Sequence, residues 1–198
     1  MALIGLTGSI ASGKSAVSER LRGLGAFVTD ADEISRELMC TASALVEDIG
    51  REFPGVVADG ELSRAALAQR VFGNAEELKK LNALTHPAII GRMHGLAREY
   101  LEQYPKGQAF LDMSLLIETG DYKNVDAVWL VTAPDALRLK RLMARDGCTE
   151  EHARKRMAAQ MPQEEKMAYA DVVIDNSYTL ERLYERVDAL YRELCARG

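Results

Sequence analysis

The residues with the clearest chemistry lie close to the N-terminus, where a glycine-rich run at positions 8–15 follows an apolar stretch at positions 2–7. The run reads G-S-I-A-S-G-K-S and fits the P-loop pattern G-x-x-x-x-G-K-[ST] without a mismatch. The apolar stretch predicts a buried strand, and a helical pattern begins directly after the glycine-rich run. A strand, a glycine-rich loop and a helix in this order are the setting in which the P-loop binds phosphate groups.

Each part of this motif has a separate physical task. Gly8 and Gly13 permit backbone angles that a side chain would forbid, so successive N–H groups can point into one concavity and hold an anion. The helix that follows adds its positive dipole end. Lys14 can reach the β- and γ-phosphates, and the Ser15 hydroxyl can ligate Mg²⁺. The alternative is a glycine-rich turn that binds nothing, but Lys14 and Ser15 favour a nucleoside triphosphate site. The predicted cradle comprises Gly8, Ser9, Ile10, Ala11, Ser12, Gly13, Lys14, Ser15 and Ala16.

Bulk composition limits the protein class. With 198 residues, the chain suits one compact domain with a small appendage. The formal net charge of −5 argues against a general nucleic-acid binder. No apolar run has the length of a membrane span, and we expect no signal peptide, because a functional loop begins almost at once. Cys40, Cys148 and Cys195 are isolated, so we expect neither disulfides nor a zinc site, and a reducing cytoplasm as the location.

The pattern of strands and helices predicts the α/β class. Strands alternating with helices give a parallel sheet with right-handed crossovers. Asp30 and Asp32 follow the second strand, and we expect them at the sheet edge that carries the glycine-rich loop. The five predicted strands cover residues 2–7, 26–29, 108–113, 127–132 and 171–174.

A helical insertion separates the second and third strands. It holds turn signals, among them Asp59-Gly60, but no run that resembles a strand. Pro87 suits the first position of the last helix. A helical insertion of this size is a plausible domain for a second substrate. The predicted helices cover residues 34–39, 44–53, 64–72, 75–84 and 87–104.

A basic helical hairpin occupies residues 138–166, where eight basic and five acidic side chains leave a local charge of +3. Arg138, Arg141 and Arg145 are three and four residues apart, so they share one helix face. Such a face can close over phosphates as a lid. A charged face exposed to solvent is the alternative that the pattern leaves open.

Among P-loop proteins, these features favour a small-molecule kinase. The Asn-Lys-x-Asp box of guanine readers is missing, since residues 132–135 read T-A-P-D. Phosphoryl transfer also needs a group that accepts the proton of the acceptor. Asp32 leads the candidates for this base, because Asp30 is placed to cap a helix that begins at Ala31. Asp112 and Glu118 are further candidates. A nucleoside or nucleotide kinase, and a regulatory module with slow hydrolysis, remain alternatives.

With these residues assembled, the sequence resembles the dephospho-coenzyme A kinase family over essentially its full length. The D-A-D, H-P and L-L-I-E elements at these spacings are more specific than the P-loop alone. The N-terminal half matches through residues 5–8 and 12–15, Asp30-Ala31-Asp32, Leu81-Asn82 with Leu84, His86-Pro87-Ala88-Ile89 and Arg92. The C-terminal half matches through Leu115-Leu116-Ile117-Glu118, Arg141, Arg145-Asp146, Arg156, Gln160, Lys166, Ala170-Asp171 and Asn176.

The resemblance implies transfer of the ATP γ-phosphate to the ribose 3′-hydroxyl of dephospho-coenzyme A, the last step of coenzyme A synthesis, with Mg²⁺ present. It implies that Asp32 is the base, that Lys14 and Arg145 act in catalysis near the phosphates, and that Arg141 and Asn176 flank the adenine. The metal ligand expected within the chain is Ser15. The residues expected to bind the acceptor are Asp32, His86, Arg92, Leu116, Ile117 and Glu118.

The implied fold is a three-layer P-loop kinase core with a five-stranded parallel sheet in the order 2-3-1-4-5. We expect residues 1–32, 105–137 and 167–198 to form this core, residues 33–104 a helical coenzyme A-binding insertion, and residues 138–166 a lid. A monomer or weak homo-oligomer is expected. Two departures concern the site: Ala11 stands where many members have Gly, and Arg138 where Gln is common.

Overall fold

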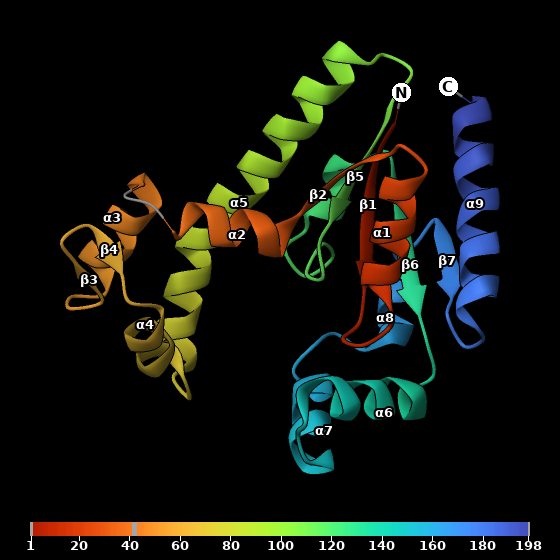
Figure 1. Ribbon diagram of the computed structural model, residues 1–198. Helices are drawn as coiled ribbons and strands as arrows, with labels where there is room; N and C mark the ends of the chain where they lie inside the picture. The colour runs from red at the N-terminus through yellow and green to blue at the C-terminus, as the bar shows by residue number, and fades with distance from the viewer. Residues whose placement is uncertain (1, 41–42, 198) are drawn as a thin grey trace. The chain divides into compact units, whose positions relative to one another are not determined.

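A computed structural model describes residues 2–40 and 43–197 of the chain. The chain divides into two compact units, Met1–Thr29 with Ala97–Gly198, and Asp30–Leu96. Among the described residues, no helix is both long and apolar enough to cross a membrane. Figure 1 labels the elements of both units.

A five-stranded sheet forms the centre of the first unit, in the order β2-β5-β1-β6-β7. β1 pairs in parallel with β5 and β6, and β6 pairs in parallel with β7. Numbered along the chain, this is the predicted order 2-3-1-4-5, which is confirmed. The strands are β1 (Ala2–Gly8), β2 (Phe27–Asp30), β5 (Gln108–Asp112), β6 (Ala127–Thr132) and β7 (Val172–Asp175).

Two helices, α1 (Lys14–Gly23) and α9 (Leu180–Arg197), pack against each other and onto one face of this sheet (Figure 1). Their apolar faces bury Leu21 and Val187 against Leu6 and Trp129 of the central strands. Arg20 in α1 donates to both carboxylate oxygens of Asp188 in α9, at 2.6 and 2.5 Å. The Arg20 guanidinium lowers the pKa of the Asp188 carboxyl.

The segment between β6 and β7 is helical, as the sequence predicts. Thr149 caps the start of its second helix through a hydrogen bond from the His152 N–H, and Gly147 ends the first in the left-handed conformation. A 3₁₀ helix, η1 (Asp121–Asn124), precedes β6. The helices are α6 (Asp135–Asp146), α7 (Glu150–Ala158) and α8 (Gln163–Met167).

The second unit has its own apolar core, which buries Ile49, Phe53 and Leu67. The prediction that this part of the chain has no strands is wrong. A short antiparallel hairpin turns at Asp59 and Gly60, which have φ values of 54° and 80°. Two left-handed residues in a row are the geometry of a tight hairpin turn. The elements are α2 (Ala31–Leu38), α3 (Ala44–Glu52), β3 (Val57–Ala58), β4 (Glu61–Leu62), α4 (Arg64–Val71) and α5 (Ala75–Gln103).

The prediction that a helix ends near residue 84 and another begins at Pro87 is also wrong. α5 is one helix of 29 residues with Pro87 inside it. An internal proline removes one backbone hydrogen bond and costs about 3 kcal/mol. Leu81, Leu84 and Ala88 all pack against the core of the second unit. Because these positions follow helical spacing across the proline, their burial offsets its cost.

Candidate functional site

The glycine-rich loop joins β1 to α1 as the sequence predicts, and its glycines are required by its geometry. Gly13 caps α1 with a φ of 98°, in the left-handed region. A Cβ at Gly13 would lie 2.0 Å from Asn176 Nδ2. A Cβ at Gly8 would lie 2.6 Å from Ser12 Oγ and 2.9 Å from the carbonyl oxygen of Val131. The loop therefore has no room for side chains at either position.

Replacing Gly13 by alanine is expected to weaken ATP binding and to lower the free energy of unfolding. The left-handed backbone alone costs an alanine about 1–2 kcal/mol, and the new methyl group must displace Asn176. Isothermal titration with ATP and thermal unfolding measure the two effects. Gly23→Ala is the matched control, since it lies at the end of α1 with no heavy atom within 4 Å of its Cβ position. Equal effects of both substitutions would contradict the geometric requirement.

Ala11 lies in the same loop with a φ of 60°, a left-handed conformation that few residues other than glycine adopt. A side chain makes the left-handed conformation unfavourable, and the methyl group of alanine is the smallest side chain that does so. The resemblance to the family, where Gly is frequent at this position, agrees with that conformation. The loop therefore keeps its shape at Ala11 with local backbone strain.

Lys14, the cation of the motif, forms an ion pair with a buried carboxylate. Lys14 Nζ donates to Asp112 Oδ1, and Ser18 Oγ donates to Asp112 Oδ2. The Asp112 side chain is 1% exposed and that of Lys14 is 15% exposed. Asp112 ends β5, where the strand register pairs it with Leu6 of β1. The strand pairing thus positions the carboxylate beneath the loop lysine.

Two side chains predicted to flank the adenine, Arg141 and Asn176, meet at the C-terminal end of the loop, next to the start of α1. Asn176 Nδ2 donates to the carbonyl oxygen of Ser12 at 2.8 Å. Arg141 Nη1 donates to the same oxygen at 3.5 Å, and its Nη2 to the carbonyl oxygen of Asn176 at 3.2 Å. α6 and the end of β7 are therefore both joined to the loop just before α1.

A third contact reaches the loop from the segment after α7. The backbone N–H of Ile10 donates to Gln160 Oε1 at 2.7 Å. Ser9 Oγ and Ser12 Oγ are buried and have no hydrogen-bond partner among the described residues. Because buried polar atoms ordinarily have partners, the loop has unused capacity for hydrogen bonds.

Arg145, predicted to act near the phosphates, donates to its neighbour Asp146 at 2.6 and 3.1 Å. Arg156 of α7 forms a second ion pair with Asp146. Arg145 and then Arg156 hold the pKa of the Asp146 carboxyl well below its usual value. The Arg145 side chain is 59% exposed, so it can exchange this partner for a ligand. Its role in catalysis stays a prediction.

Lys166, in the basic hairpin, is fully buried. At this residue the hairpin is therefore not the solvent-exposed charged face that the sequence left open. Its Nζ contacts Glu118 Oε1 at 2.8 Å and donates to the carbonyl oxygen of Ser114 at 3.0 Å. Leu116 and Ile117 in the same turn are 0% and 4% exposed. Their side chains belong to the core, and the part that these residues and Glu118 take in binding an acceptor stays a prediction.

The acidic pair after β2 separates into two environments. Asp30 Oδ1 accepts hydrogen bonds from the N–H groups of Asp32 and Glu33, at 2.8 and 3.1 Å, so Asp30 caps α2 as expected. Asp32 lies in the first turn of α2 and is exposed. Asp32 therefore keeps a carboxylate that the cap does not use.

The remaining predicted acceptor residues lie on α5 in the second unit. His86 is half-buried, and burial lowers the pKa of its imidazole below 6.5, which favours the neutral ring at pH 7. Arg92 Nη2 lies 3.6 Å from Glu37 Oε1. Arg92 is exposed and His86 is partly exposed, and their roles in binding the acceptor stay predictions.

Known proteins resemble this chain over nearly its whole length. The family model described as dephospho-CoA kinase matches residues 2–182. The chain belongs to the dephospho-CoA kinase family. The dephospho-CoA kinase of Corynebacterium jeikeium is 44% identical over 192 residues, which cover 96% of this chain and 98% of the relative.

Two solved structures agree with this membership. The crystal structure of TT1252 from Thermus thermophilus is 38% identical with a TM-score of 0.79, and the match covers 98% of this chain and 97% of the other. The dephospho-CoA kinase from Campylobacter jejuni is 26% identical with a TM-score of 0.66 and the same coverage. The predicted family and fold are therefore confirmed.

Three features of this dephospho-CoA kinase family member were not predicted from the sequence. They are the hydrogen bond of Gln160 to the loop, the hydrogen bond of Ser18 to Asp112, and the burial of Arg138. Gln160 matches the family pattern, which is a signal that could have marked it as a site residue. Ser18 lies one helical turn after Lys14, but only strand pairing reveals its partner.

Proposed function

We propose that this chain transfers the γ-phosphate of ATP to the ribose 3′-hydroxyl of dephospho-coenzyme A, releasing coenzyme A and ADP in the final step of coenzyme A synthesis. The observation that carries this proposal is the family match over residues 2–182, which spans the intact phosphate-binding loop. ATP is accordingly the co-substrate of the family reaction.

In this proposal, the loop between β1 and α1 binds the phosphates. Its backbone N–H groups and the N-terminus of α1 provide donors, and Lys14 provides the positive charge. Arg141 and Asn176 hold the adenine end, supported by their position beside the loop residue Ser12. Arg145 adds a cation near the phosphates after it leaves Asp146.

Mg²⁺ would be bound through Ser15. Ser15 is an exposed residue in the first turn of α1, and one protein oxygen plus phosphate oxygens and water is a donor set that suits this ion. When bound, Mg²⁺ neutralises charge on the phosphates. Asp112 is less suited as a direct ligand, because both of its oxygens already accept bonds from Lys14 and Ser18.

Asp32 is the proposed base. Of the four candidate carboxylates, Asp30 caps a helix, Asp112 pairs with Lys14, and Glu118 pairs with buried Lys166. The 3′-oxygen attacks the γ-phosphorus, the bond from this phosphorus to the β,γ-bridging oxygen breaks, and the hydroxyl proton passes to Asp32. ADP then leaves with the electron pair of the broken bond.

We further propose that residues 33–104 bind the coenzyme A portion, with His86 and Arg92, and that residues 138–166 act as the lid. Leu116, Ile117 and Glu118 form the turn beside the acceptor. The unpaired Cys40, Cys148 and Cys195 support a cytoplasmic location, and we propose a monomer or weak homo-oligomer.

An acceptor panel tests the proposed reaction. The protein is incubated with Mg-ATP and dephospho-coenzyme A, nucleosides, or nucleoside monophosphates, and ADP release is followed. We expect ADP to form rapidly only with dephospho-coenzyme A. Rapid release with another acceptor would indicate a nucleoside or nucleotide kinase, and an equally slow release with every acceptor would indicate a regulatory module.

A further inference from the structure

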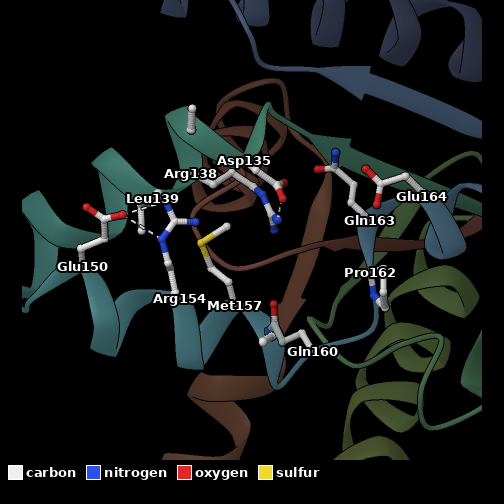
Figure 2. Close-up of a pocket in the computed structure, with 12 residues that line it drawn as sticks. Asp135, Arg138, Leu139, Glu150, Arg154, Met157, Gln160, Pro162, Gln163 and Glu164 are labelled. Atoms are coloured by element: carbon white, nitrogen blue, oxygen red, sulfur yellow. Dashed lines mark hydrogen bonds and ion pairs between the residues drawn. The ribbon is translucent and has the colours of Figure 1, made fainter.

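A cavity of about 870 Å³ lies between α6, α7 and the segment that leads into α8. Figure 2 shows the side chains that surround it, with Arg138 on one wall and Gln160 on another. Met157, Leu139 and Pro162 add apolar surface. The cavity therefore has a polar part and an apolar part, as ligand sites commonly have.

Arg138 is the buried charge of this cavity. The residue is 5% exposed, whereas the Asp135 side chain that it contacts is 72% exposed. Arg138 Nη2 donates to Asp135 Oδ1 at 2.7 Å, and Arg138 Nε has no partner among the described residues. An exposed partner in contact with water neutralises a buried guanidinium weakly. A buried cation with an unused donor is suited to an additional anion.

The other charged groups of the cavity do not provide this anion. Glu150 is already paired with Arg154, whose Nη2 lies 2.7 Å from Glu150 Oε1, and both side chains are more than half exposed. Glu164 is exposed as well. Two arginines and three carboxylates line the cavity. All three carboxylates and Arg154 are exposed, so Arg138 is the buried charge among them.

Gln160 connects the cavity to the phosphate-binding loop. Its side chain lines the cavity, and its Oε1 accepts the hydrogen bond of the Ile10 N–H at 2.7 Å. The Ile10 N–H is one of the donors expected to hold phosphate. A phosphate oxygen is a stronger acceptor than a neutral amide oxygen. A nucleotide in the loop can therefore replace Gln160 at this donor, at the wall of the cavity that contains Arg138.

We infer that Arg138 binds the terminal phosphate of the nucleoside triphosphate once that phosphate has replaced Gln160 at the Ile10 N–H. This inference rests on the nucleotide binding of the proposed function, but it does not depend on the acceptor. Arg138 then distinguishes a triphosphate from a diphosphate, because only the triphosphate extends to its guanidinium. The same charge stabilises the transferred group in the transition state.

The test compares the affinities of two nucleotides in the absence of acceptor. Isothermal titration with Mg²⁺ present gives the Kd of β,γ-imido-ATP and of ADP for the wild-type protein and for Arg138→Gln. We expect Arg138→Gln to raise the Kd of the triphosphate about 10- to 100-fold, the range for a hydrogen bond to a charged group, and to leave the Kd of ADP nearly unchanged. Arg154→Gln is the matched control, since this arginine lines the same cavity but is exposed and already paired, and we expect no change.

An equal loss of affinity for both nucleotides, or no loss, would overturn the inference, because a purely structural role does not distinguish them. The ratio of two affinities from one preparation does not depend on its folded fraction. Should Arg138→Gln fail to fold, the same two affinities are measured for Arg138→Lys. A lysine cannot reproduce the guanidinium fork, so the ratio should fall severalfold, and an unchanged ratio overturns the inference. A wild-type protein that binds the triphosphate but uses another acceptor contradicts only the proposed reaction.

Discussion

Asp32→Asn is expected to lower kcat for phosphorylation of dephospho-coenzyme A by about 10²- to 10⁴-fold, the range for loss of a positioned base. The Kd for ATP should change little, because an exposed side chain in the first turn of α2 is not part of the phosphate-binding loop. A fall in kcat and kcat/KM together identifies an interaction made only in the transition state. Steady-state kinetics and titration with ATP measure both quantities.

Asp30→Asn is the matched control for this substitution. Asparagine caps a helix as well as aspartate does, so the hydrogen bonds from the N–H groups of Asp32 and Glu33 can be kept. We expect activity close to that of the wild-type protein. A large loss in Asp30→Asn with normal turnover in Asp32→Asn would assign the base to Asp30 instead.

Lys14→Met is expected to lower kcat by about 10²- to 10³-fold, the range for the loss of one preorganised donor at a developing charge. It should also weaken ATP binding, since Lys14 contacts the phosphates in the ground state in our proposal. The substitution has a second effect, because it leaves the Asp112 carboxylate buried without its cation. Breaking a buried ion pair costs about 3–5 kcal/mol of stability.

The double variant Lys14→Met with Asp112→Asn separates these two effects. The Asp112→Asn substitution removes the unpaired charge and keeps an acceptor for the Ser18 hydroxyl, so the melting temperature should recover most of its loss. Activity should stay low, because the missing ammonium is not replaced. Recovery of turnover along with stability would show that Lys14 acts only as a structural partner of Asp112.

Local chemistry predicts much of this fold. The phosphate-binding loop, the Asp30 cap and the Gly147 stop each depend on residues that are adjacent in sequence, and the structure places all three as expected. The parallel sheet follows from the alternation of strands and helices. Its strand order came from the family resemblance and is confirmed.

Features that depend on contacts distant in sequence were not predictable in the same way. Pro87 is a local signal for a helix start, but burial of Leu84 and Ala88 against one core keeps α5 continuous. Lys166 looks like a surface lysine in sequence, but its ion pair with Glu118, 48 residues away, and its hydrogen bond to the carbonyl oxygen of Ser114 explain how it can be buried. The Asp59-Gly60 pair is a usable hairpin signal, but without strand-like runs beside it the pattern indicates only a turn between helices.

Two prolines stand at the ends of the segment that contains α6 and α7. Pro134 precedes α6 with a φ of −55°, and Pro162 precedes α8 with a φ of −52°. Beyond Pro162, Gln163 accepts a hydrogen bond from the Ala133 N–H, and buried Lys166 anchors α8 to the turn after β5. In the proposed lid, α6 and α7 are therefore the part that would move, between these two prolines. α8 is held to the first unit by these contacts, so the moving part would be shorter than residues 138–166.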